Sequence, residues 1–93
     1  MEPKRLIEDL FGSRAQVKIL KELALKEELN ISLIIKKTKL NHAGVKKHLR
    51  YLLDVGLVQE KKFGRIRIYR FKLENIKARS FLKFLRIWED ETL

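Results

Sequence analysis

The sequence LNHAGVKKHLRYLLDVGLV, residues 40–58 of the 93-residue chain, decides the fold. Asn41 is a residue type that caps helices, and it precedes an apolar stripe at helical spacing, made of Val45, Leu49, Leu52 and Leu53. Gly56 fits the left-handed residue that commonly ends a helix. The stretch therefore predicts a capped helix from Asn41 to Val55 with polar and basic residues on its outer face.

Two helices are predicted at the start of the chain. Pro3 suits the first turn of a short helix that Gly12 ends. Ser13 and Gln16 have the spacing of a capping box and open a second helix that fades around Glu28. The apolar stripe of this second helix is expected to contain Val17, Leu20, Leu23 and Ala24.

A short helix is predicted just before the Asn41 cap. Residues 30–32 read as an extended link, and Ser32 is placed to cap a helix over residues 33–38. Lys39 occupies the turn that follows, where glycine would be easier. We therefore expect strain or a longer turn at Lys39.

The hydrophobic period changes from 3.6 to 2 after the helix over residues 41–55. Residues 57–62 and 65–72 are predicted to pair as antiparallel strands, with Phe63 and Gly64 at the tip of the hairpin. A final helix is expected from Asn75 toward Asp90. The predicted order is helix, helix, short strand, helix, helix, hairpin, helix, which is a mainly α fold with a small β-hairpin (α+β).

The positive charge is concentrated in the middle of the chain. The sequence has 22 Lys and Arg against 12 Asp and Glu, a formal net charge of +10. Residues 36–72 hold twelve of the basic residues but only two acidic ones, Asp54 and Glu60, while the flanks hold ten of each sign. The whole surplus therefore lies in this stretch, which favours a polyanionic partner over a merely solvated basic face.

Several function classes are disfavoured by composition. The chain has no cysteine and two histidines, which removes disulfides, thiolate metal sites and cysteine nucleophiles and leaves little for a histidine cluster. We find no Ser-His-acid arrangement, no glycine-rich phosphate loop and no paired carboxylates in an apolar setting, so we expect neither an enzyme nor a cofactor. No apolar run is long enough for a membrane span and no signal-peptide pattern is seen, so we expect a cytoplasmic protein. The lack of cysteine and the abundance of Lys, Glu, Ile and Leu suit a heat-adapted source.

The chain resembles winged helix-turn-helix regulators of the ArsR and MarR types. The residues that carry the resemblance are Asn41, Val45, His48-Leu49 and Gly56-Leu57-Val58, followed by wing residues up to Tyr69. The similarity extends from Ser13 to Phe71, and its short length is like that of minimal archaeal and archaeal-virus members. The length of 93 residues predicts a single domain over residues 1–93, and the helix-turn-helix and wing are expected in residues 13–72. The cysteine ligands and the His/Asp clusters that bind metals in such regulators are absent from the sequence, and the sequence indicates no small-molecule pocket.

This resemblance implies a sequence-specific regulator of transcription that binds double-stranded DNA. The second helix of the motif enters the major groove and the basic wing lies on the flanking backbone or minor groove. The expected DNA-binding residues are His42, Ala43, Gly44, Lys46, Lys47, Arg50, Lys61, Lys62, Arg65 and Arg67. His48 is expected to be packed and hydrogen-bonded, whereas Phe63 fits either a groove contact or a turn hydrophobe. The alternative functions are a sequence-neutral nucleoid protein and a protein–protein adaptor.

The last helix is expected to make a homodimer. Its apolar residues cover more than one face, which is typical of a partner surface, although they could also complete the core of one protomer. We expect residues 75–91 to form a dimerisation helix. The predicted interface residues are Leu6, Leu10, Phe81, Leu82, Phe84, Leu85 and Trp88.

Overall fold

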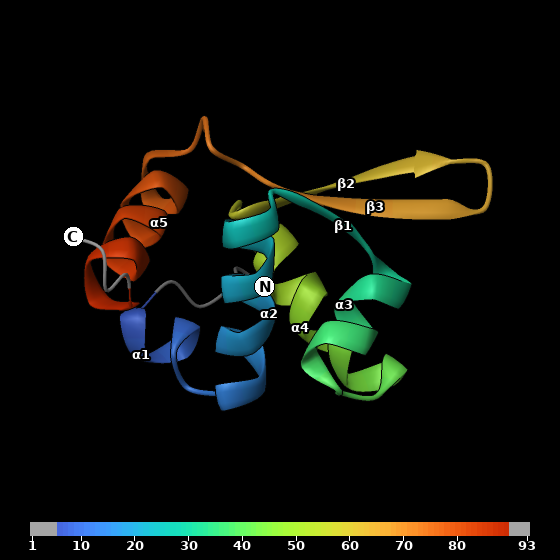
Figure 1. Ribbon diagram of the computed structural model, residues 1–93, viewed down its shortest axis with the longest axis horizontal. Helices are drawn as coiled ribbons and strands as arrows, with labels where there is room; N and C mark the ends of the chain where they lie inside the picture. The colour runs from blue at the N-terminus through green and yellow to red at the C-terminus, as the bar shows by residue number, and fades with distance from the viewer. Residues whose placement is uncertain (1–5, 90–93) are drawn as a thin grey trace.

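The computed structural model describes residues 6–89, which form five helices and a three-stranded antiparallel sheet (Figure 1). The elements are α1 (Ile7–Leu10), α2 (Arg14–Lys26), β1 (Glu28–Asn30), α3 (Ile31–Thr38), α4 (His42–Asp54), β2 (Val58–Phe63), β3 (Ile66–Phe71) and α5 (Ile76–Glu89). The predicted mainly α fold with a hairpin, a winged helix-turn-helix, is confirmed. The predicted helix start at Pro3 and helix end at Asp90 lie outside the described residues.

The wing is a three-stranded sheet in the order β1-β3-β2. β3 pairs with β2 along its whole length and with β1 over three residues, from Glu28–Arg70 to Asn30–Ile68. The hairpin turns at Gly64 and Arg65, because Phe63 and Ile66 already form the last strand pair. The predicted tip, Phe63-Gly64, is therefore wrong by one residue. The predicted extended link over residues 30–32 is also displaced, since β1 ends at Asn30.

The cap of α3 differs from the prediction. Asn30 precedes the helix, and its Oδ1 accepts a 2.8 Å hydrogen bond from the backbone N–H of Leu33. Ser32 lies inside the first turn, so the predicted Ser32 cap is wrong: an Asn two residues earlier satisfies the free N–H group first. The strain predicted at Lys39 is confirmed, because this residue adopts the left-handed conformation with φ 60°.

The helix α4 begins and ends as the sequence predicts. The Oδ1 of Asn41 accepts a 2.7 Å hydrogen bond from the N–H of Gly44. After Asp54 the chain turns through Gly56, whose φ of +83° is in the region that favours glycine. The N–H of Leu57 then bonds the carbonyl of Leu52 at 3.1 Å, which closes the helix and starts the wing.

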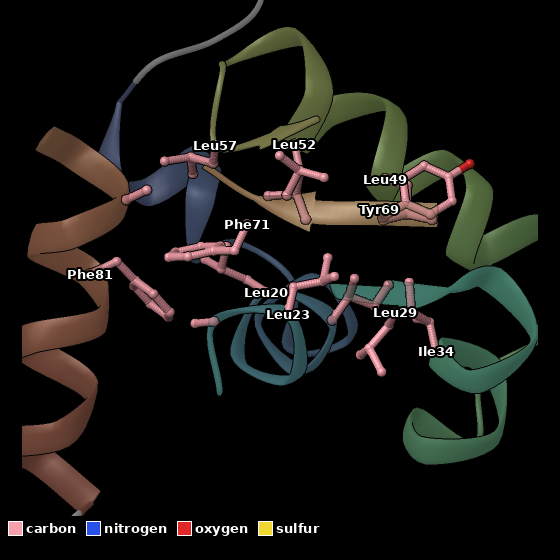
Figure 2. Close-up of a cluster of buried hydrophobic side chains, with 14 of the residues drawn as sticks. Leu20, Leu23, Leu29, Ile34, Leu49, Leu52, Leu57, Tyr69, Phe71 and Phe81 are labelled. Atoms are coloured by element: carbon pink, nitrogen blue, oxygen red, sulfur yellow. The ribbon is translucent and has the colours of Figure 1, made fainter. Parts of the chain in front are cut away.

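One apolar core joins α2, α3, α4, α5 and the base of the wing (Figure 2). Its largest fully buried side chains are Phe71, Ile19, Leu20, Leu23, Ile34, Leu49, Leu52 and Val45. Each contributes about 1.5–3 kcal/mol on burial. The predicted stripe of α2 needs a correction: Ile19 and Gln16 are buried, whereas Val17 is only half-buried.

The helix α5 completes this core and lies at the end of the molecule opposite the wing tip (Figure 1). The ring of Phe81 lies between those of Phe11 and Phe71, with centroid distances of 6.1 and 6.4 Å. Leu82 and Leu85 are also buried within the protomer. Phe81, Leu82 and Leu85 thus belong to the core of the protomer, and the dimer contact predicted for them stays a prediction.

Candidate nucleic-acid interface

The outer face of α4 carries five of the ten predicted DNA-binding residues together. His42, Ala43, Lys46, Lys47 and Arg50 are all exposed. Because positions three and four apart lie on one helix face, these residues form a continuous stripe. Arg50 makes one solvent-exposed ion pair, 3.5 Å from Asp54 in the next turn. Lys46 and Lys47 form no ion pair with any residue in the described range 6–89, so both ammonium groups are available to a ligand.

Gly44 differs from the rest of this stripe. It is half-buried, and a Cβ atom at this position would lie 3.0 Å from Oδ1 of Asn41, the atom that caps α4. A side chain here would press on the cap. The glycine therefore has a structural reason to be in α4, and the DNA contact predicted for it stays a prediction.

The helix α3 adds cations that the sequence-based site omitted. Lys36, Lys37 and Lys39 are exposed, and α3 packs directly against α4. In a helix-turn-helix the first helix crosses the DNA backbone. The signal for these residues was present in the charge count of residues 36–72, but their position was not known before α3 was placed.

The four predicted wing cations are not equivalent. Lys61 is half-buried and forms an ion pair of 3.2 Å with Glu28 on β1, and Arg67 lies 3.9 Å from Glu60. Lys62 and Arg65 are exposed and make no ion pair within residues 6–89. The tip of the wing is therefore more available to an anion than its base.

The single acidic side chain of the hairpin is held by its neighbours. The hydroxyl of Tyr69 donates a 2.7 Å hydrogen bond to Oε2 of Glu60. Burial, followed by this bond to Glu60, raises the pKa of Tyr69 to about 12. The carboxylate of Glu60 thus interacts with Tyr69 and Arg67, which lessens its electrostatic repulsion of a nearby phosphate.

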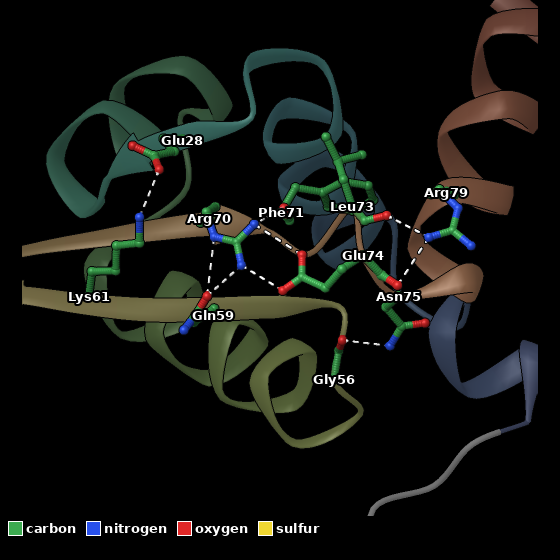
Figure 3. A network of polar contacts seen from close by, with 10 residues as sticks. All are labelled: Glu28, Gly56, Gln59, Lys61, Arg70, Phe71, Leu73, Glu74, Asn75 and Arg79. Carbon is green, nitrogen blue, oxygen red and sulfur yellow. Dashed lines mark hydrogen bonds and ion pairs between the residues drawn. The ribbon is translucent and has the colours of Figure 1, made fainter.

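A polar network fixes the base of the wing (Figure 3). The guanidinium of Arg70 donates to Oε1 of Gln59 at 2.6 and 3.1 Å and to the carboxylate of Glu74 at 2.7 and 3.1 Å. The hydrogen bond from Arg70 lowers the pKa of Glu74 to about 2. Nearby, Nδ2 of Asn75 donates to the carbonyl of Gly56 at 2.9 Å. These contacts hold the two wing strands, the end of α4 and the start of α5 in one arrangement.

Gln16 connects α4 to the first helix. Its backbone N–H bonds Oγ of Ser13 at 3.3 Å, which is one half of the predicted capping box. The side chain does not return to the backbone of Ser13; its Nε2 donates to the carbonyls of Asp9 and Leu10 at 3.2 and 2.9 Å. Its Oε1 lies 3.1 Å from Nδ1 of His48, so the predicted packed and hydrogen-bonded role of His48 is confirmed. Burial, and then the charge of Lys47, lower the pKa of His48.

An open apolar groove of about 580 Å³ lies between α1 and α5, and no residue of α4 or of the wing strands lines it. Its lining includes Leu6, Ile7, Leu10, Phe11, Ile76 and Phe84. Phe84 is 52% exposed and stacks on Trp88, which is 76% exposed, with a centroid distance of 5.8 Å. Of the predicted dimer residues, Leu6, Phe84 and Trp88 are thus exposed and Leu10 is half-buried.

Residues 6–89 contain no group of three or more His, Cys, Asp or Glu side chains that could hold a metal ion. None of the helices in this range has both the length and the apolar character needed to cross a membrane.

Comparison with solved structures finds the same fold in known regulators. HlyU from Vibrio cholerae N16961 superposes with a TM-score of 0.76 at 19% identity, over 89% of this chain and 87% of that chain. The transcriptional repressor PagR of Bacillus anthracis gives 0.69 at 25% identity, over 83% and 85%. The homodimeric winged helix-turn-helix DNA-binding domain Mb0332 from Mycobacterium bovis gives 0.71 at 21% identity, over 92% and 77%.

The sequence comparisons assign the family. No curated protein sequence matches the chain. The sequence pattern of bacterial regulatory proteins of the arsR family, however, matches residues 13–60, which is just over half of the chain and runs from the cap of α2 into β2. The chain therefore belongs to the arsR family of bacterial regulatory proteins and is a DNA-binding transcription regulator with a winged helix-turn-helix fold.

Proposed function

We propose that this regulator binds palindromic double-stranded DNA as a homodimer, with α4 in the major groove and the wing on the flanking backbone or minor groove. The observation that carries the proposal is the stripe of exposed side chains on α4, which presents Lys46, Lys47 and Arg50 on one face. An α-helix fits the major groove, which is about 12 Å wide, so such a face meets base edges and phosphates at once.

The side chains of the stripe suit different parts of the groove. Lys47 and Arg50 have the length and charge to donate to O6 and N7 of guanine. Ala43 is small and apolar near the start of α4 and suits contact with a thymine methyl group. His42 lies beside it at the first residue of the helix. Lys36, Lys37 and Lys39 on the α3 side are assigned to phosphates, which position the helix but do not read sequence.

The groove between α1 and α5 is the surface that we assign to a second copy of the chain. Leu6 and Phe84 expose apolar area there, and the exposed Trp88 stacks on Phe84; such a patch commonly marks an interface. The similar Mycobacterium bovis domain is described as homodimeric. A two-fold pair places two α4 helices in successive major grooves, about 34 Å apart. The predicted single domain over residues 1–93, with residues 75–91 as the dimerisation helix, is part of this proposal.

Duplex DNA is the one partner besides the second copy that we assign. DNA binding as proposed uses no metal, cofactor or catalytic step, since Lys and Arg contacts with phosphates supply the affinity. We place the protein in the cytoplasm with the chromosome that it regulates. Its heat-adapted, archaeal or viral source stays a prediction.

In vitro selection from a random duplex library tests the proposal. We expect recovered sites with two inverted half-sites whose centres are one helical turn apart. If each protomer neutralises about four phosphates, log Kd against log salt concentration has a slope of magnitude roughly 7. Uniform coating without a recovered site would support a sequence-neutral nucleoid protein instead. No association at low ionic strength would contradict DNA binding altogether.

A further inference from the structure

We propose that Phe63 and Ile66 form an apolar wedge at the wing tip that enters the minor groove and kinks the DNA. The proposal rests on the proposed function above, because it needs α4 to hold the wing beside a duplex. It adds a contact that the cationic residues do not provide, and it assigns a specificity role to DNA that the protein deforms.

The two side chains lie together at the end of the hairpin. Phe63 and Ile66 are the last residue pair of β2 and β3. The turn between them consists of Gly64 and Arg65, and the φ of +61° at Gly64 is that of a tight two-residue turn. Residues directly opposite in an antiparallel pair point to the same face of the sheet. The pair therefore forms a single apolar knob at the end of the two strands, next to the turn.

No helix covers this knob. Phe63 is 60% exposed and Ile66 is 56% exposed. The hairpin extends past β1 and α3, so its tip is far from α2 and α5 (Figure 1). Strand alternation puts Phe63 and Ile66 on the face opposite the buried Tyr69 and Phe71. The wedge is thus separate from the core and contributes nothing to its packing.

The charges around the knob favour DNA as its occupant. Arg65 lies in the turn, and Lys62 and Arg67 form the neighbouring strand pair on the other face. An apolar protein surface over the tip would have to bury Arg65, which forms no ion pair within residues 6–89, and burial of an unpaired charge is costly. The minor groove offers sugars and base edges to an apolar side chain and a row of phosphates on each side for the cations.

The width of the minor groove and the deformability of DNA are consistent with an apolar wedge. The minor groove is about 6 Å wide, and proteins that insert Phe or Ile there partly unstack a base step and kink the duplex by roughly 20–90°. Pyrimidine–purine steps such as TA and CA unstack most easily. We therefore expect such a step at a fixed distance outside each half-site, where α4 makes no base contact.

The test uses the full chain and the duplex recovered by selection, labelled at its ends for a fluorescence-transfer measurement of bending. The wild-type chain should bend it by tens of degrees. The double variant Phe63→Ser/Ile66→Ser should reduce the bend by at least half and weaken binding about fivefold to tenfold. Its salt slope should remain unchanged, because no phosphate contact is lost. A 2-aminopurine placed in the flanking step should brighten with the wild-type chain only.

The control Leu25→Ser removes an exposed apolar side chain from α2, on a surface outside the assigned interface. It should bend and bind DNA as the wild type does, and circular dichroism should show all variants folded. A straight wild-type complex, a double variant that bends DNA normally, or a lower salt slope in the double variant would each overturn the wedge. Failure of the wild-type chain to select any site would instead contradict the proposed function itself.

Discussion

Nδ1 of His48 on α4 lies 3.1 Å from Oε1 of Gln16 on α2. The amide nitrogen of Gln16 is already donating to the carbonyls of Asp9 and Leu10, so its oxygen must accept. The hydrogen therefore resides on Nδ1 of His48, and Gln16 is only 5% exposed. The buried side chain of Gln16 thus connects α4, the helix proposed to bind DNA, with α1, which lines the α1–α5 groove.

Replacing Gln16 with Leu should destabilise the fold. Leu keeps the volume of the side chain but leaves two carbonyls and one imidazole N–H without their partner, at a cost of about 1–3 kcal/mol. Urea unfolding followed by circular dichroism measures the change. Lys18→Leu on the exposed side of the same helix is the control and should stay within about 0.5 kcal/mol of the wild type. A Gln16→Leu variant as stable as the control would show that water replaces the amide.

Stability should fall as the pH drops below 6.5 because of His48. Its pKa is lowered in the folded state, so the unfolded chain binds a proton first. The stabilisation from neutral His48 is present above pH 6.5 and is lost as the pH falls toward the folded pKa. Urea midpoints between pH 5 and 8 should decline less in His48→Gln than in the wild type. Ala43→Gln, at an exposed position on the same helix, removes no titratable group and should decline as the wild type does; equal slopes in all three proteins would contradict the prediction.

Lys47→Ala and Arg50→Ala should weaken binding to the selected site more than binding to random duplex. Loss of a paired contact with guanine costs roughly 1–3 kcal/mol of discrimination, which is about fivefold to a hundredfold or more. Competition between labelled selected duplex and unlabelled random duplex measures the ratio. Lys18→Ala on α2 removes a charge of the same kind outside the interface and should leave the ratio unchanged. Equal losses on both duplexes would assign these residues to phosphates alone.

Phe84→Glu should dissociate the proposed homodimer without unfolding the protomer. Phe84 is half exposed and stacks on Trp88, so a carboxylate there disrupts the interface and leaves the buried core intact. We expect the dimer Kd to rise at least tenfold, a cost of about 1.4 kcal/mol or more. Sedimentation velocity measures the mass, and Lys83→Glu at the neighbouring exposed position is the matched control. A variant that stays dimeric would place the interface elsewhere.

Glu27→Gly should stabilise the protein. Glu27 ends α2 with φ 71° and ψ −49°, a conformation that costs a residue with a Cβ about 1–3 kcal/mol. Glycine removes the strain but loses more entropy on folding, so a net gain of about 0.5–1 kcal/mol is expected. The adjacent Lys26→Gly, which is helical, should lose a similar amount. Thermal unfolding measures both, and a destabilised Glu27→Gly would show that the strain is smaller than the entropy lost.

Local signals predicted most of the fold. The cap at Asn41, the stripe from Val45 to Leu52 and the glycine at position 56 gave α4 its bounds, because each depends on residues close in the chain. The change of period after Gly56 gave the hairpin. The cap of α3 was missed because Asn30 and Ser32 are both good capping residues, and the strand pairing of β1 decides between them.

Long-range packing explains what the sequence did not give. Phe81 and Phe84 belong to the same apolar pattern in the sequence. Phe81 is buried and Phe84 is exposed because of the way α1 packs against α5, which the sequence alone does not show. The sequence did not predict that Gln16 connects α1 and α4, because the capping box already accounted for a glutamine at this position. Likewise, Arg67 and Lys61 looked equivalent to Lys62 until their acidic neighbours on β2 and β1 were located.

The position of β1 has a mechanical consequence. This strand joins directly to α3 and also hydrogen-bonds to β3. The first helix of the helix-turn-helix and the hairpin therefore share a backbone connection. Any tilt of α3 must either carry the hairpin along or break the β1–β3 ladder. Release from a duplex should consequently be concerted, with both grooves vacated in one step and no stable complex held by a single element.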